Sequence, residues 1–191
     1  LAKQTGLPTF VDNDAKAVVL GEAWCGAAVG HRDVSGMVMS TGVGGGIICD
    51  GRLLDGDSGN AGHIGHVNVV PNGRECKCGA RGCLEAVASG TAIAQMTGRP
   101  AAEATPEVIA QTGTYVGRAV ATVATLLDLR LAVICGSVAL GFGEPFFRAA
   151  QAEVDRYARI KFVRGVQVRP TGLGADAPLV GAAAVARRHV A

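Results

Sequence analysis

Three cysteines and a histidine form the group with the most specific chemistry in this sequence. Cys76, Cys78 and Cys83 lie within eight residues of a glycine-rich segment, and His66 precedes them. Three thiolates and one imidazole complete a tetrahedral Zn²⁺ site, and four protein ligands leave no position open for a reacting water. The set predicts a structural zinc ion, with reduced, unligated thiols as the alternative. The remaining cysteines lie in apolar segments and are expected to be small buried side chains: Cys25, Cys49 and Cys135.

A glycine-rich run, Thr41–Gly46 (TGVGGG), lies between two apolar segments. A strand–turn–strand hairpin of this composition exposes backbone N–H groups that could hold phosphate oxygens. The run is not a P-loop, because no Gly-Lys-Ser/Thr follows. It is not a dinucleotide fingerprint either, because a strand and not a helix follows. A plain tight hairpin explains the pattern equally well.

A short acidic run, Asp12-Asn13-Asp14, stands where an extended segment gives way to a helix. Asp14 could accept a proton from a hydroxyl nucleophile, as phosphoryl-transfer enzymes with a general base require, and the Asn13 amide could bind the same ligand. Ordinary helix capping by these short polar side chains is the alternative.

The elements that must position these residues alternate between strands and helices, which predicts a mixed α/β layer fold. The expected strands are Leu7–Val11, Ser35–Ser40, Ile47–Cys49, Val67–Val70, Leu131–Cys135 and Val166–Pro170. The expected helices are Ala15–Ala27, a short one at Asn60–His66, Cys83–Met96, Glu107–Leu127 with a break at Gly113, Glu144–Arg159 and Pro178–Arg188.

Composition sets the wider limits. The 191 residues are 49% apolar and 18% charged, enough for a folded core. A net charge of +2 gives no nucleic-acid-binding surface. No apolar run is long enough to span a membrane and no signal peptide precedes the domain, so we expect a cytoplasmic protein. Because the chain begins with Leu1 and not Met, we expect a fragment of a longer protein.

Taken in order, the motifs resemble the ROK family of repressors and sugar kinases, within the actin-like ATPase superfamily. The resemblance covers most of the chain and is carried by VDNDAKAVVLGEA, STGVGGGIICDG, GNAGHIGHV, CKCGARGCLEAVASG and VICGSVALG. It implies an α/β, ribonuclease H-like fold, of which residues 1–191 form the C-terminal lobe. A zinc- and sugar-binding segment would occupy about residues 60–90, and the N-terminal lobe with its phosphate loop is absent from this sequence.

The resemblance also implies roles for individual residues. The catalytic base would be Asp14, and the sugar would contact Asn13, His66 and Glu85. The ATP phosphates would lie near Thr41, Gly42, Gly44 and Gly45, and Gly136-Ser137 resembles the turn on the adenosine side. The zinc ligands would be His66, Cys76, Cys78 and Cys83.

His63 departs from the family pattern, which has Glu at this position, three residues before the zinc histidine. On a short helix, positions 63 and 66 share a face, so we expect His63 to point toward the sugar. Unlike Glu, a neutral imidazole offers one donor and one acceptor, so hexose selectivity should differ. The alternatives are a supporting or surface residue, or a competing zinc ligand.

Three functions are compatible with these observations. The first is an ATP- and Mg²⁺-dependent kinase acting on a glucose-like hexose 6-hydroxyl, with this lobe alone inactive. The second is the sugar-sensing domain of a ROK transcriptional repressor, and the third is a non-catalytic lobe. The resemblance further implies a homodimer, without membrane or nucleic-acid contact from this lobe.

Overall fold

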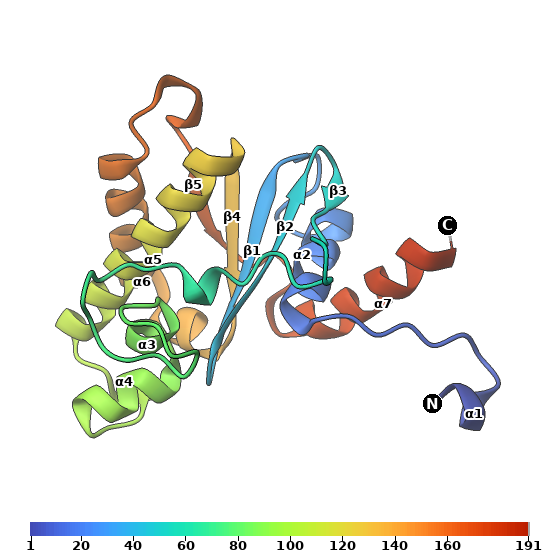
Figure 1. Ribbon diagram of the computed structural model, residues 1–191, viewed down its shortest axis with the longest axis horizontal. Coiled ribbons are helices and arrows are strands. Elements are labelled where there is room, and N and C mark those ends of the chain that lie inside the picture. The colour runs from blue at the N-terminus through green and yellow to red at the C-terminus, as the bar shows by residue number, and fades with distance from the viewer. Residues whose placement is uncertain (191) are drawn as a thin grey trace.

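A mixed five-stranded sheet forms the centre of the computed structural model, which describes residues 1–190 (Figure 1). The strand order is β3-β2-β1-β4-β5. The β1–β2 and β2–β3 pairs are antiparallel, and the β1–β4 and β4–β5 pairs are parallel. The strands are β1 (Val34–Met39), β2 (Val43–Cys49), β3 (Arg52–Leu53), β4 (Leu131–Cys135) and β5 (Gln167–Pro170). The predicted mixed α/β sheet is therefore confirmed.

Helices cover both faces of this sheet and give three layers (Figure 1). Ala132 and Ile134 of β4 belong to the core shared with α5 and α6, whereas Leu131 and Val133 face α2. This alternation is what a strand buried on both faces requires. The helices are α1 (Ala2–Thr5), α2 (Asp14–Cys25), α3 (Glu85–Ala88), α4 (Gly90–Thr97), α5 (Pro106–Leu127), α6 (Ser137–Tyr157) and α7 (Ala177–Val190). None of the helices within residues 1–190 is long and apolar enough to cross a membrane.

The glycine run is mostly strand and not loop. The turn expected over Thr41–Gly46 is shorter, because strand β2 already begins at Val43 and its three glycines pair with β1 in regular register. A methyl group on Gly46 would lie 2.8 Å from Cα of Lys16. The glycines therefore let α2 approach the hairpin closely, a role that the local sequence does not reveal.

Helix α2, which begins at Asp14, is fixed at its other end by a buried carboxylate. Glu22 accepts hydrogen bonds from the backbone N–H groups of Ala27 at 2.7 Å and Gly172 at 3.1 Å. Its side chain is fully buried and forms no salt bridge within residues 1–190, so these donors must offset its desolvation. The helix thereby has a defined position relative to the loop that follows β5.

Two expected strands are wrong. Residues 7–11 form no strand, and Val11 is 90% exposed. This segment runs away from the sheet (Figure 1), so no neighbouring strand is available for pairing. Residues 67–70 form only an isolated bridge between Asn68 and Cys83. Both segments carry the apolar composition of strands, but a strand also needs a partner edge.

Several expected helix boundaries also change. Helix α5 continues through Gly113, where the missing side chain allows close approach to the backbone of Phe146 in α6. Helix α6 begins at Ser137, seven residues early, and bends at Gly143.

Two further segments and one cysteine differ from expectation. The region 83–96 divides into α3 and α4, because Ser89 adopts an extended conformation and caps α4. The segment 60–66 holds only one 3₁₀ turn, η1 (Ile64–His66). Cys25, expected to be buried, is exposed at the end of α2.

Candidate functional site

The four predicted zinc ligands converge on one point. Their ligand atoms all lie within 4.8 Å of one another. Cys76 Sγ lies 3.7 Å from His66 Nδ1, and Cys78 Sγ lies 3.7 Å from Cys83 Sγ. Zn–S bonds of about 2.3 Å in a tetrahedron place the sulfur atoms about 3.8 Å apart. The residues present therefore fit a zinc ion, and His63 lies outside this ligand group.

Two of the three thiols in the cluster are buried. Cys76 and Cys83 are 4% and 1% exposed. Burial, together with the neighbouring thiols, raises the pKa of Cys83 to about 12. A thiol in this environment becomes a thiolate when a divalent ion supplies the compensating charge. Without an ion Cys83 is therefore a neutral thiol, and the fit to a metal rests on the positions of the four ligand atoms.

The segment that carries the cysteines has almost no regular structure. It turns sharply at Gly82, which has a φ of 77° and leaves no room for a side chain against Val70. Two isolated bridges, Asn68 with Cys83 and Glu75 with Arg81, are its only strand-like pairings among the described residues. Its shape depends on turns, a few hydrogen bonds and the ligand cluster.

A hollow of about 440 Å³ lies between this segment, the β1–β2 turn and the start of α2. Its lining includes most of the residues to which the sequence assigns catalysis, sugar binding or phosphate binding. They come from four separate parts of the chain and meet only in the folded structure: Asp14, Thr41, Gly42, Gly44, His63, His66 and Glu85.

Asp14 and Asn13 occupy different positions in this arrangement. Asn13 is the N-cap of α2, and its side-chain oxygen accepts the Ala15 N–H at 2.9 Å. It is not part of the lining of the hollow. Asp14 is the first residue of the helix and is exposed to the hollow, close to Gly44. The Asp14 Oδ1 also accepts the Ala15 N–H, at 2.8 Å, so both residues cap the helix and only Asp14 lines the hollow.

Glu85 connects the two sides of the hollow. One of its carboxylate oxygens accepts the backbone N–H of Val43 at 3.0 Å. Glu85 begins α3 two residues after Cys83, and Val43 begins β2 directly after the turn. The zinc segment and the glycine hairpin are therefore joined by a charge-assisted hydrogen bond.

His63 lies beside His66, as the spacing predicts. Their ring centroids are 6.1 Å apart with an interplanar angle of 28°. His66 directs Nδ1 toward Cys76, so its Nε2 is on the opposite side of the ring. Two imidazoles therefore form one edge of the hollow, where each can donate or accept a hydrogen bond.

A second hollow of about 560 Å³ lies on the other side of the β1–β2 turn. Thr41 and Ser137 line it, together with Ser40 and Arg99, which sequence reasoning did not single out. The Ser137 and Ser40 hydroxyl groups are 3.2 Å apart.

Gly45, predicted near the phosphates, and Gly136, predicted on the adenosine side, lie outside both hollows. Gly136 has a φ of 99° and packs against Met39, and Gly45 packs against Gly62. Their missing side chains serve close packing in this structure.

An ion cluster holds the segment before His63 in place. The buried Lys16 donates to Asp55 at 2.9 Å and to the Gly59 carbonyl at 2.8 Å. Arg188 of α7 reaches the other Asp55 oxygen at 2.5 Å. These hydrogen bonds, from Arg188 first and then Lys16, lower the pKa of Asp55 to about 2. Sequence reasoning missed this cluster because Asp55 is 39 residues from Lys16 and 133 residues from Arg188.

Comparisons with known proteins identify the family of this chain. A model of the ROK family matches residues 1–189. A glucokinase from Halalkalibacterium halodurans is 34% identical over 95% of this chain and 64% of its own length. A crystal structure of a ROK family glucokinase from Streptomyces griseus, in complex with glucose and AMPPNP, has a TM-score of 0.84 at 32% identity. The match covers 98% of this chain and 70% of that one.

A transcriptional regulator is also similar. The crystal structure of a ROK family homolog of the Escherichia coli MLC protein has a TM-score of 0.82 at 29% identity, over 97% of this chain and 53% of its own length. The chain thus spans about two thirds of the glucokinase relative and about half of this regulator. These structures confirm the predicted fold.

Proposed function

Because this chain belongs to the ROK family, we propose that the whole protein is an ATP-dependent sugar kinase that phosphorylates the 6-hydroxyl of a glucose-like hexose. One observation carries the proposal. A single hollow brings the exposed carboxylate of Asp14 together with the β1–β2 turn and with three residues suited to sugar hydroxyls, His63, His66 and Glu85. A carboxylate beside a phosphate-binding turn is what transfer from a nucleotide to a hydroxyl requires.

In this mechanism, the oxygen of the sugar hydroxyl attacks the γ-phosphorus of ATP while Asp14 takes the proton from that hydroxyl. An O–P bond forms to the sugar, and the bond from the γ-phosphorus to the bridging oxygen breaks, releasing ADP. The N–H groups of the turn at Thr41 and Gly42 would hold phosphate oxygens, and Mg²⁺ bound to ATP would offset their charge.

The sugar would lie against the edge formed by the two imidazoles and Glu85. Zinc bound to His66, Cys76, Cys78 and Cys83 would fix the position of this edge and supply no reactive group, because all four of its positions are occupied by protein. His66 would then serve both the ion, through Nδ1, and the sugar, through Nε2. Asn13, as the cap of α2, would position Asp14 and contact the sugar only through its amide nitrogen.

The nucleotide would extend past the turn into the second hollow. Ser137 at the start of α6 would lie near the adenosine, and Gly136 would give the turn its shape. Gly44 would leave space for substrate beside Asp14, and Gly45 would let the zinc segment approach. Residues 1–191 would form one lobe, and a second lobe would complete the cleft. The match to 64% of a glucokinase's length supports this division.

The sugar-sensing domain of a repressor is the second candidate, and the similarity to the MLC homolog favours it. The kinase and the repressor candidates can be distinguished by reading the coding sequence upstream of Leu1. A phosphate-loop lobe alone supports the kinase, whereas an additional basic helix-turn-helix segment supports the regulator.

A homodimer and a cytoplasmic location are also part of the kinase proposal. Light scattering on the purified protein tests whether it is a dimer.

The direct test is phosphoryl transfer by the whole protein. It should be incubated with ATP, Mg²⁺ and each of a panel of hexoses, with the product identified as a sugar 6-phosphate by mass spectrometry and NMR. Transfer to glucose or a close relative is the expected result. Sugar binding by calorimetry without any transfer would contradict the kinase proposal and support the sensor.

A further inference from the structure

The cysteine segment, residues 67–83, has few hydrogen bonds to the rest of the molecule. Most of its hydrogen bonds stay inside residues 64–84, such as those from Val69 and Val70 to the Gly82 carbonyl at 2.8 and 3.2 Å. Within residues 1–190, two side chains from elsewhere bond to it, those of Arg118 and Gln95. The position of the segment therefore depends on few contacts.

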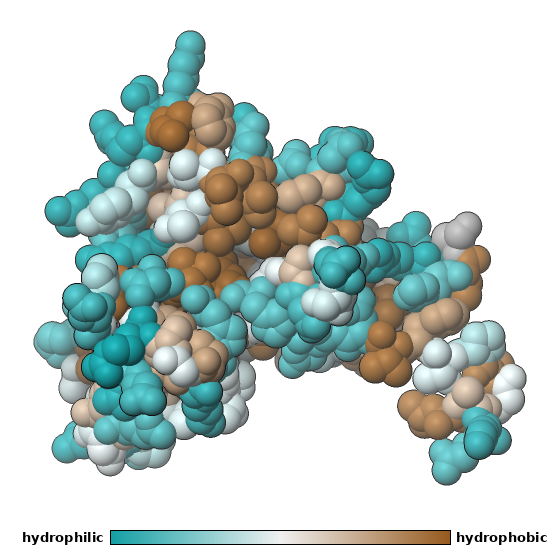
Figure 2. Space-filling view, in the orientation of Figure 1, coloured by the Kyte–Doolittle hydropathy of each residue, from teal (hydrophilic) through white to brown (hydrophobic). Residues whose placement is uncertain are grey.

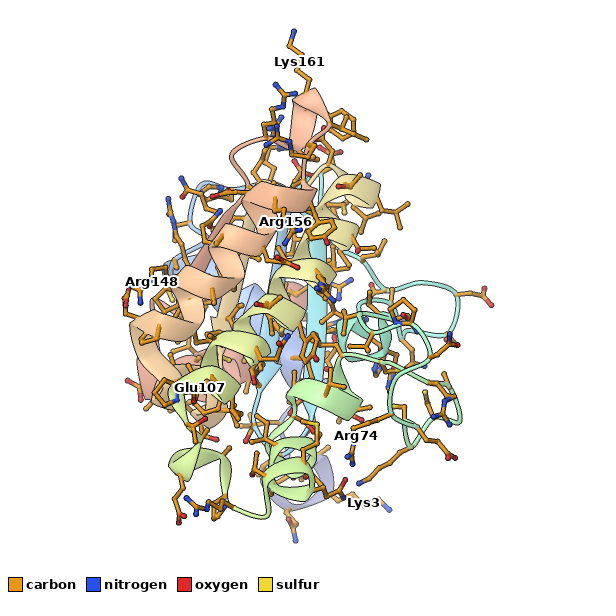
Figure 3. All side chains as sticks on the ribbon, turned by 90° about the vertical axis from the view of Figure 1, so that its left-hand side faces the viewer. Lys3, Arg74, Glu107, Arg148, Arg156 and Lys161 are labelled. Carbon is orange, nitrogen blue, oxygen red and sulfur yellow. The ribbon has the colours of Figure 1, made fainter. Side chains whose placement is uncertain are left out.

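Of the two hydrogen bonds that these side chains make to the segment, the one between Arg74 and Gln95 is the weaker. Its length is 3.2 Å and both side chains are exposed. Arg74 projects from the segment near α4 (Figure 3). Exposed polar contacts of this kind contribute little, because water competes for both partners.

Arg118 of α5 makes the better-defined connection. Its Nε donates to Glu153 Oε1 of α6 at 2.8 Å, and its Nη1 donates to the Val69 carbonyl at 3.2 Å. Glu153 is buried, with a side chain only 9% exposed. Its charge fixes the guanidinium, and the planar guanidinium directs a second donor at the segment.

A groove of about 740 Å³ surrounds this connection, between α5 and residues 68–71. Arg118, Val69 and Leu126 line it, and Leu126 is 78% exposed. Figure 2 shows apolar surface on this side of the molecule, above the segment. The hydrogen bond from Arg118 to the Val69 carbonyl therefore lies at the edge of this groove.

The connection continues from Val69 to the zinc ligands. The Val69 N–H donates to the Gly82 carbonyl, and the Asn68 amide donates to the Arg81 carbonyl at 2.7 Å. Gly82 directly precedes Cys83, and Glu85 follows two residues later. A shift at Val69 would therefore reach a zinc ligand and a sugar-contacting residue through two hydrogen bonds.

We propose that Arg118, oriented by Glu153, is a positioning residue that holds the zinc segment in the geometry needed for metal retention and sugar binding. The metal part follows from the ligand cluster alone. The sugar part rests on the proposed kinase function.

The test compares zinc release from the whole, zinc-loaded protein after addition of an excess of a chromogenic chelator. Arg118→Met should release zinc about tenfold faster than wild type, at the lower end of the effect of outer-shell partners. Because Arg118→Met leaves the Glu153 charge buried and unpaired, the double variant Arg118→Met/Glu153→Gln is needed to remove that charge. It should recover thermal stability and still release zinc about tenfold faster.

Two further variants separate positioning from general stability. Arg118→Lys keeps a cation near Glu153 but lacks the planar pair of donors, so its zinc release should also be faster than wild type. Arg148→Met removes an exposed α6 arginine that pairs with Glu144 and should release zinc like wild type.

Zinc release from the double variant within twofold of wild type would overturn the proposal, as would equally fast release from Arg148→Met. The KM for sugar should rise with the zinc-release rate across the series, with kcat nearly constant. If the protein transfers no phosphate, the zinc measurement still decides the metal part of the proposal.

Discussion

The two sides of the central hollow are built in different ways. The hairpin wall, consisting of β1, β2 and the first turn of α2, is regular structure in close contact, with Gly46 lying against Lys16. The zinc wall, residues 63–85, holds one 3₁₀ turn and two isolated bridges. The hairpin wall is held by its own packing, whereas the shape of the zinc wall would depend on the proposed zinc ion and on a few hydrogen bonds.

This difference suggests a division of tasks. The hairpin wall carries the proposed base, Asp14, and the proposed phosphate-binding turn, for which fixed geometry matters most. The zinc wall carries His63, His66 and Glu85, whose arrangement would set which sugar fits if the proposed function is correct. A wall shaped by turns tolerates substitutions such as histidine at position 63 without a change in the fold.

Among the changes considered, zinc removal should have the largest effect on function, and it should alter the zinc wall but not the hairpin wall. In the whole protein, chelation should lower sugar affinity about 10³-fold, equal to about 4 kcal/mol, because His66 and Glu85 lose their fixed positions. The far-UV circular dichroism should hardly change, since the zinc wall contains little helix or strand. Isothermal calorimetry with zinc-loaded and zinc-free protein measures the first effect.

Cys49→Ser provides the matched control, because Cys49 is a partly buried cysteine outside the ligand cluster. It should retain one zinc per chain and wild-type affinity. Unchanged sugar affinity in zinc-free protein would show that the zinc wall does not form the sugar site.

The glycines of the two walls should differ in their tolerance of side chains. In Gly46→Val, the new side chain would meet the α2 backbone at Lys16, and this overpacking should cost about 3 kcal/mol. Gly79→Ala, in the zinc wall, has open space around it but a φ of 89°, and should cost only about 1 kcal/mol. Urea unfolding of both variants measures the difference, and equal losses would contradict the contrast in packing.

The sequence predicts local features of this molecule better than contacts between distant segments. Leu131–Cys135 matches β4, and the cysteine spacing predicts the ligand cluster, because both depend on neighbouring residues. Whether residues 7–11 pair as a strand depends on a partner edge. The packing role of Gly46 depends on where α2 lies.

The same limit applies to the site. The motifs predict many of the residues that surround the hollow, including His63 beside His66, but they also include Asn13 and Gly45, which do not line it. They do not predict that Glu85 bonds to Val43, or that Arg118 bonds to Val69, because these partners are 42 and 49 residues apart. Such pairs carry no local pattern.

A smaller, pH-dependent effect is expected at Asp55, which holds the segment leading into the zinc wall. Its pKa is lowered to about 2 by Arg188 and Lys16. The ionised form therefore stabilises the fold above the unfolded pKa of about 4, and this contribution is lost as the pH falls from about 4 to about 2. The side chain is 42% exposed, so solvent screening reduces the contribution to roughly 1 kcal/mol.

Asp55→Asn should remove this pH dependence and lower stability at pH 7 by a similar amount. Thermal unfolding between pH 2 and pH 7 measures both effects. If Asp55→Asn loses stability on acidification with the same pH profile as wild type, Asp55 does not contribute to the pH dependence of stability.

The division between a chemical wall and a recognition wall is tested most directly by Asp14→Asn in the whole protein, with kcat and the sugar Kd measured on the same preparation. The account predicts that kcat falls about 10³-fold while the Kd stays within about threefold of wild type. Asp12→Asn, which alters the neighbouring carboxylate, should retain kcat. An Asp14→Asn protein with kcat within tenfold of wild type would contradict the account, because the hairpin wall would then not supply the base.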